Sequence, residues 1–236
     1  MKNIWRKSLM CGFVISVLCS FINFSGKCVS ISSKVFRLHI IANSDSIEDQ
    51  SLKLRVRDRI LKDYGFEMSK SENLYEAEIL AEDNLENIKI SAEDELLKCG
   101  CKYPVNVEVV NMHFNTRIYE NITLPAGNYD ALRITIGDAK GKNWWCVMFP
   151  PMCLPVAQSE EEISSNESEI SEVLDNSEFQ IVTNFGNYQI EFKLRELFSE
   201  LNDFLNNEIY FPLKKYFSVS DNFKYEPAIS LGRETF

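Results

Sequence analysis

The sequence has few histidines and no excess of positive charge, and each of these features argues against a class of function. The 236 residues contain two histidines, His39 and His113, which lie far apart in the chain. The run Cys99-Gly-Cys101 lacks zinc-ligand spacing, so no metal or other cofactor is expected. The formal net charge of −10 argues against nucleic acid as a partner, because its phosphates would be repelled. Nothing in the sequence indicates a small-molecule substrate.

Glycine is also infrequent, and one glycine pair deserves a test as a phosphate-binding loop. Residues 137–142 read GDAKGK. The glycines are one residue too close for such a loop, and Asn143 occupies the position at which Ser or Thr would bind Mg²⁺. We therefore interpret this segment as a tight turn between two strands.

The chain has no apolar run of the roughly 20 residues that a transmembrane helix needs. The longest, Ser8–Ile22, follows a basic start at residues 1–7 and precedes small residues near Ser30. This pattern is typical of a secretory signal. Residues 1–30 are thus predicted to be a signal peptide, with an N-terminal membrane anchor as the alternative, and not to be part of the fold.

Export would decide the state of the cysteines. Cleavage near residue 30 would leave four, and an oxidising compartment would permit disulfides between them. We single out Cys146 and Cys153, because Pro150-Pro151 can fold the chain back between them. The alternative is that both are small buried thiols.

The predicted fold class is α+β, with a mixed, mainly antiparallel sheet packed against several helices. Its centre is a predicted hairpin of two buried strands, 131–137 and 143–149, which are rich in β-branched and aromatic residues. Other predicted strands are 35–41, 104–114, 116–123 and 179–183. Predicted helices are 47–64, 71–98 and 191–217, the last interrupted by Pro212.

A single domain is expected over residues 31–217, followed by an irregular tail at 218–236. Within it, residues 156–178 are predicted to form an acidic, solvated loop with a weak helical tendency at 170–174. The stretch 156–179 holds eight acids and no lysine or arginine.

Three segments together closely resemble the stage II sporulation protein R family of endospore-forming Firmicutes. They are Arg37–Leu61, Leu124–Gly137 and Gly141–Leu154, of which the runs NSDS and GKNWWC are the most specific. The resemblance implies a protein made in the forespore and exported into the space between the two sporulation membranes. There it would activate a membrane-embedded aspartic protease of the mother-cell membrane, which removes the pro-sequence of sigma-E. It implies no catalytic residues, and we expect no enzyme.

A partner contact is the hypothesis for the polar loop after the first strand and for the basic helix that follows. The alternative is that these side chains only cap the helix or pair locally. If the contact hypothesis holds, Arg57→Glu should abolish protease activation in a protein that still folds. The residues concerned are Asn43, Ser44, Asp45, Arg55, Arg57 and Asp58.

A second function also fits parts of the sequence. Cys146 with His39 or His113 could form a nucleophile–base pair in a secreted or anchored envelope hydrolase. The local sequence does not specify this pair, and a cysteine within WWCVMF is expected to be buried and poorly reactive.

Overall fold

The computed structural model describes residues 2–119, 121–152 and 169–204. The chain divides into two compact units, Met1–Glu196 and Leu197–Phe236. The helices are α1 (Lys2–Ser32), α2 (Ile47–Ile60), α3 (Phe66–Ser69), α4 (Leu74–Asp83), α5 (Leu85–Lys98), α7 (Asn176–Thr183) and α8 (Gln189–Phe204). The strands are β1 (Phe36–Ile41), β2 (Val105–Phe114), β3 (Arg117–Tyr119), β4 (Ile122–Leu124), β5 (Gly127–Ile136) and β6 (Asn143–Phe149).

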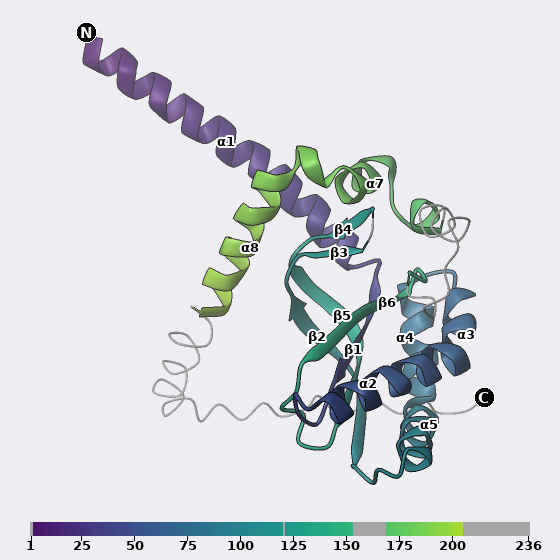
Figure 1. Cartoon of the computed structure of the whole chain (residues 1–236). Helices are drawn as coiled ribbons and strands as arrows, with labels where there is room; N and C mark the ends of the chain where they lie inside the picture. Colours follow the sequence, from purple (N-terminus) through teal and green to yellow (C-terminus); the bar gives the residue numbers. More distant parts are fainter. Residues whose placement is uncertain (1, 120, 153–168, 205–236) are drawn as a thin grey trace, which may run out of the picture. The chain divides into compact units, whose positions relative to one another are not determined.

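The main sheet has four strands in the order β2-β5-β1-β6 (Figure 1). Strand β1 is parallel to β5 and antiparallel to β6, while β2 is antiparallel to β5. The α+β class with a mixed, mainly antiparallel sheet is therefore confirmed. The central hairpin needs a correction, because β1 lies between β5 and β6 and the two do not pair directly. The first strand, which is buried on both faces although one face carries Arg37 and His39, takes a central position in the sheet.

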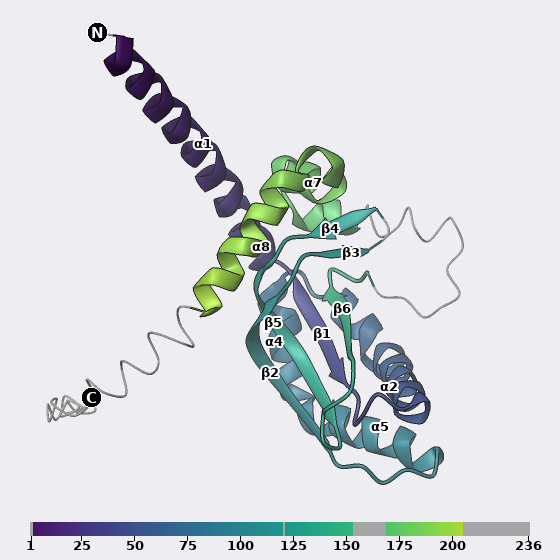
Figure 2. The ribbon, with the colours of Figure 1, turned by 60° about the vertical axis from the view of Figure 1, so that its left-hand side comes forward.

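Helices α2, α4 and α5 cover one face of this sheet (Figure 2). The alternation along β1 places Leu38 and Ile40 on this face. The narrow apolar seam predicted over 71–98 is buried as expected, but Asn84 divides it into two helices, and its side chain donates to the carbonyl of Leu80. The seam residues buried in this core are Ala77, Ala81, Ile88, Ala92 and Leu96.

A second core lies on the other face of the sheet and is built from segments far apart in sequence. It joins the end of α1, the hairpin β3–β4, the helical turn 169–173, α7 and the start of α8. The predicted strand 179–183 is wrong, since these residues form most of α7. A capping box explains this helix: Asp175 accepts from the Glu178 amide, and the Glu178 carboxylate accepts from the Asp175 amide. The segment 116–123, predicted as one strand, includes β3 and most of β4, two short strands that pair with each other and not with β2.

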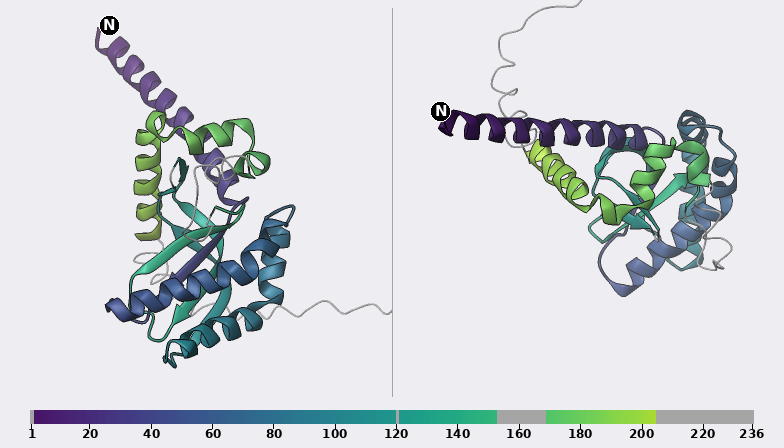
Figure 3. Two further views of the ribbon diagram at one scale, coloured as in Figure 1. Left: turned by 45° about the vertical axis from the view of Figure 1, so that its right-hand side comes forward. Right: turned by 90° about the horizontal axis from the view of Figure 1, so that it is seen from above.

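The N-terminal helix differs from the expectation that residues 1–30 lie outside the fold. Phe24, Cys28 and Ile31 are buried in the second core, where Phe24 packs against the rings of Tyr188 and Phe192. Burial raises the pKa of the Cys28 thiol to about 12. Residues 4–13 are exposed, and this end of α1 stands clear of the sheet (Figure 3). No helix in the described part of the chain is long and apolar enough to cross a membrane.

We predict that the two halves of α1 contribute unequally to stability. Deleting residues 2–20 should leave the melting temperature nearly unchanged. Deleting residues 2–30 should lower the free energy of unfolding by roughly 4 kcal/mol, because it removes Phe24 and Cys28 from the second core. Denaturant unfolding of the two truncated chains measures the difference. Equal stabilities would show that the packing of α1 contributes nothing.

Candidate functional site

Two loops interlock at one end of the sheet, and together they contain the run NSDS and the start of the run GKNWWC. One is the loop between β1 and α2, residues 42–46, and the other is the turn between β5 and β6, residues 137–142. The amide of Gly141 donates to the carbonyl of Ala42, and the amide of Lys140 donates to the carbonyl of Asn43. Side chains add to this: Asn43 accepts from the amide of Asp138 through Oδ1. We call these residues the interlocked loops.

A buried carboxylate organises the first of these loops. Asp49, 5% exposed on the first turn of α2, accepts from Asn43 Nδ2 at 2.8 Å and from Ser44 Oγ at 2.5 Å. The hydrogen bond from Ser44 is the main cause that lowers the pKa of Asp49, and bonds from Asn43 and Tyr103 act in the same direction against burial. Ser46 caps the helix by accepting from the amide of Asp49.

The two glycines of the turn are needed because the first loop leaves no room for a side chain. A Cβ at Gly141 would lie 2.6 Å from the carbonyl carbon of Ser44 and even nearer to its oxygen. At Gly137, where φ is +59°, it would lie 2.8 Å from Cγ of Asn43. The turn GDAKGK thus serves close packing between backbones, as the rejection of a phosphate loop implied.

Lysine and arginine of α2 extend the same network. Lys53, one of the basic residues of this helix, is 4% exposed and donates to the carbonyl of Lys142 at 2.9 Å. Its burial lowers its pKa. Arg57 is 6% exposed, pairs with Asp58 at 2.6 Å, and places its guanidinium 4.3 Å from the ring centre of Trp144. The basic face predicted for α2 is therefore corrected at these two positions.

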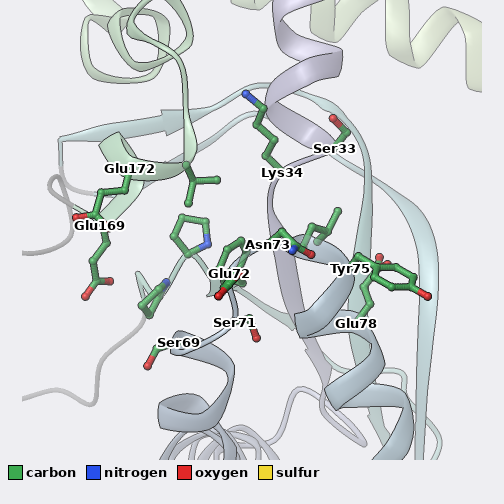
Figure 4. A pocket seen from close by; sticks show the side chains of 15 residues that line it. Ser33, Lys34, Ser69, Ser71, Glu72, Asn73, Tyr75, Glu78, Glu169 and Glu172 are labelled. Atoms are coloured by element: carbon green, nitrogen blue, oxygen red, sulfur yellow. The ribbon is translucent and has the colours of Figure 1, made fainter.

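A cavity of about 940 Å³ lies elsewhere in the described part of the chain. It opens between the start of α4 and the helical turn 169–173, and four glutamates line it (Figure 4). Burial, with Asp130 and Glu82 nearby, raises the pKa of Glu78 to about 7. Neither histidine lines this cavity. In the described part of the chain, no group of His, Cys, Asp and Glu is arranged to hold a metal ion.

The comparisons with known proteins agree with the sequence runs in these loops. A family model described as stage II sporulation protein R matches residues 32–159, more than half of the chain. The chain belongs to the stage II sporulation protein R family. One relative, the stage II sporulation protein R of Bacillus subtilis (strain 168), is 36% identical over 139 residues, 59% of this chain. That match spans 62% of the relative's length. No solved structure matches the chain.

The region that matches this family of sporulation signalling proteins begins at the end of α1 and extends past β6. It includes both interlocked loops. Of the six residues in our contact hypothesis, the structure gathers Asn43, Ser44 and Asp45 in one loop, where each accepts or donates within the network. Arg57 and Asp58 pair with each other. Arg55 is exposed.

Sequence reasoning missed Asp49 and Lys53 as buried polar residues. The signal was present in their spacing, because positions 49, 53, 56 and 60 lie on one face of a helix and two of them are apolar. Polar residues on the apolar face of a helix need buried partners. Here the partners come from both interlocked loops.

The structure separates the groups that a Cys146 hydrolase would need. Residue Leu38 stands opposite Cys146 in the register and shares its core, whereas His39 stacks on Trp145 at 3.9 Å on the other face of the sheet. His113 lies on β2, three strand spacings or about 14 Å away. Cys146 is disulfide-bonded. Cys153 lies outside the described residues, so its pairing with Cys146 stays a prediction.

Proposed function

We propose that this protein is an exported sporulation signal, made in the forespore, that activates a membrane-embedded aspartic protease of the mother-cell membrane. The activated protease then removes the pro-sequence of sigma-E. Membership of the stage II sporulation protein R family supports this proposal. So does the basic and apolar start of the chain, which has the pattern of an export signal.

The observation that carries the proposal is the rigid platform formed by the interlocked loops. Asn43, Ser44 and Asp45 are used internally, so a partner would be recognised by the exposed side chains on these loops and on α2. Ile47, the first residue of α2, is 86% exposed, and it lies two residues from Asp45, which accepts from the Lys142 amide. Aromatic and apolar anchors ringed by charge are typical of contact surfaces. We call Ile47, Arg55, Lys140 and Lys142, all exposed, the activator surface.

The test is sigma-E processing in sporulating cells. Cells lacking this protein should accumulate the unprocessed precursor, and the wild-type gene should restore the mature form. Normal processing in the deletion strain would overturn the proposed function.

The position of Arg57 changes which substitution tests the surface. Arg57→Glu would bury a carboxylate beside Asp58 and unfold the chain, so its loss of activity would not report on contact. Arg55→Glu should reduce processing at least tenfold, about 1.4 kcal/mol of binding, without changing the melting temperature. Lys62→Glu, the same charge change at another exposed position of the chain, is the matched control and should process normally. Normal processing by the Arg55 variant would remove the activator surface but leave the proposed function intact.

A further inference from the structure

The side chain of Arg37 is a buried cation with part of its guanidinium unused. Arg37 lies on β1 and has no exposed surface. Its side chain is on the face of the sheet that carries the second core, opposite the helices α2, α4 and α5. Its Nε donates to the carbonyl of Cys146 at 3.5 Å, and its Nη2 donates to the hydroxyl of Tyr119. Its Nη1 has no hydrogen-bond partner in the described part of the chain. A guanidinium has five N–H donors in a fixed fork, so this is an incomplete set.

The described residues around Arg37 are aromatic and offer it no counter-ion. Its guanidinium carbon lies 4.2 Å from the ring centre of Phe114 and 4.9 Å from that of Tyr129. Burial lowers the pKa of Arg37, the hydroxyls of Tyr119 and Tyr129 oppose this, and the charge of Arg117 adds to it. Among the described residues, no carboxylate contributes. A buried charge is costly unless an opposite charge pairs with it. Because the chain has 35 acidic residues against 25 lysines and arginines, a buried arginine without a carboxylate partner is unusual here.

A second unpartnered nitrogen lies beside it on the same side of β1. His39 is 3% exposed, its Nε2 contacts Oδ1 of Asn143 at 3.0 Å, and its Nδ1 has no partner. Its ring stacks on Trp145, over which the exposed Arg117 also lies, 5.6 Å from the ring centre. The two arginines therefore contact neighbouring rings, since Phe114 under Arg37 meets Trp145 under Arg117 at 4.8 Å, and one arginine is buried while the other is exposed.

Of the side chains that shield the guanidinium of Arg37 from solvent, that of Tyr119 is the one that can be displaced. It lies on β3, a three-residue strand that pairs only with the three-residue β4. The hairpin is held in the second core by Ile122 and Leu124 of β4, whereas the ring of Tyr119 is only partly buried, so the ring can be displaced while the hairpin stays packed. That movement would free Nη2 of Arg37 and expose it together with Nη1.

We propose that Arg37 is the receptor for a carboxylate of a partner protein, an aspartate or glutamate side chain in an acidic segment. The carboxylate takes the place of the Tyr119 hydroxyl and accepts from both Nη1 and Nη2, the paired geometry in which guanidinium and carboxylate bind most strongly. Arg117 at the surface attracts the acidic segment, and the rings of Phe114 and Tyr129 exclude water from the pair. The proposal goes beyond the activator surface and does not depend on the identity of the protease.

The test follows the Arg37 side-chain Nε–H signal of the full-length protein by NMR. The probes are an acetylated, amidated peptide of Gly and Ser with two central glutamates, and the same peptide with glutamines. The glutamate peptide should shift the signal and the glutamine peptide should not. An equal shift with both peptides, or no shift with either, would overturn the proposal. So would a larger effect from inorganic phosphate at equal ionic strength, which would point to a phosphate ligand.

Three variants separate binding from a structural role. Tyr119→Phe removes the competing acceptor, so the affinity for the glutamate peptide should rise by about fivefold. Arg37→Met should abolish binding of the glutamate peptide. In this variant, binding is measured through the side-chain Nε–H signal of Arg117. Arg133→Met is the matched control and should bind normally, because the guanidinium of Arg133 already pairs with Glu108 at 2.8 Å. Weaker binding by Tyr119→Phe, or unchanged binding by Arg37→Met, would contradict the assignment.

Discussion

Gly141→Ala should lower the free energy of unfolding by about 3 kcal/mol, and the melting temperature by roughly 10 °C. The new methyl group would overlap the carbonyl group of Ser44 and lie 2.9 Å from Cβ of Ala42. Backbone atoms cannot rotate away as the end of a side chain can. The two interlocked loops would therefore have to separate, which breaks the hydrogen bond from the Gly141 amide to the carbonyl of Ala42.

The matched control is Gly26→Ala. Gly26 lies within α1 with no atom within 4 Å of the added methyl group. Because alanine favours a helix by about 1 kcal/mol over glycine, this change should be neutral or stabilising. Denaturant unfolding of both variants checks the prediction. Equal stabilities of the Gly141 variant and the wild type would show that the loops do not pack as closely as described.

The strands of the main sheet and the helices that cover it could be predicted, because each has a local pattern of apolar residues in the sequence. Alternation marks β2, a narrow apolar seam marks α4 and α5, and apolar runs mark β1, β5 and β6. The pairing of strands could not be predicted in the same way. Two apolar runs separated by a short turn favour a hairpin, and only the burial of both faces of β1 indicates that it lies between them.

Helix α7 shows a different limit. The run FQIVT has the composition of a strand, but Asp175 and Glu178 form a capping box just before it. The cap, together with Lys27 pairing with Asp175 and Lys34 pairing with Glu178, ties this segment to α1. These contacts span almost 150 residues, so no local pattern could have indicated them.

The candidate site was located from sequence, but its mechanism of assembly was not. The specific runs NSDS and GKNWWC pointed to both interlocked loops. Reading the polar residues as a contact surface was natural because loops often carry function. The structure shows that Asn43 and Ser44 face a buried carboxylate, so the polarity of the loop first satisfies Asp49. A sequence cannot show which side of a loop faces inward.

Asp49→Ala should therefore be among the most destabilising single substitutions, by about 3 kcal/mol. It leaves the half-buried side-chain donors of Asn43 and Ser44 without their charged acceptor. Asp138→Ala is the control, because Asp138 is exposed and pairs with the exposed Lys140, an interaction worth little in water. Unfolding by urea at neutral pH measures both, and equal effects would contradict the role assigned to Asp49.

The same carboxylate should make the stability depend on pH in a definite direction. The hydrogen bonds from Ser44 and Asn43 hold the pKa of Asp49 below its ordinary value in the folded protein. The stabilisation is therefore complete above about pH 4, the value of an unperturbed aspartate, and is lost as the pH falls through the lower folded value. Asp49→Asn cannot ionise, so the gap in stability between it and the wild type should be largest near neutral pH and should narrow in acid. A gap that stays constant from pH 7 to about pH 3 would show that hydrogen bonding to the ionised form is not what Asp49 supplies.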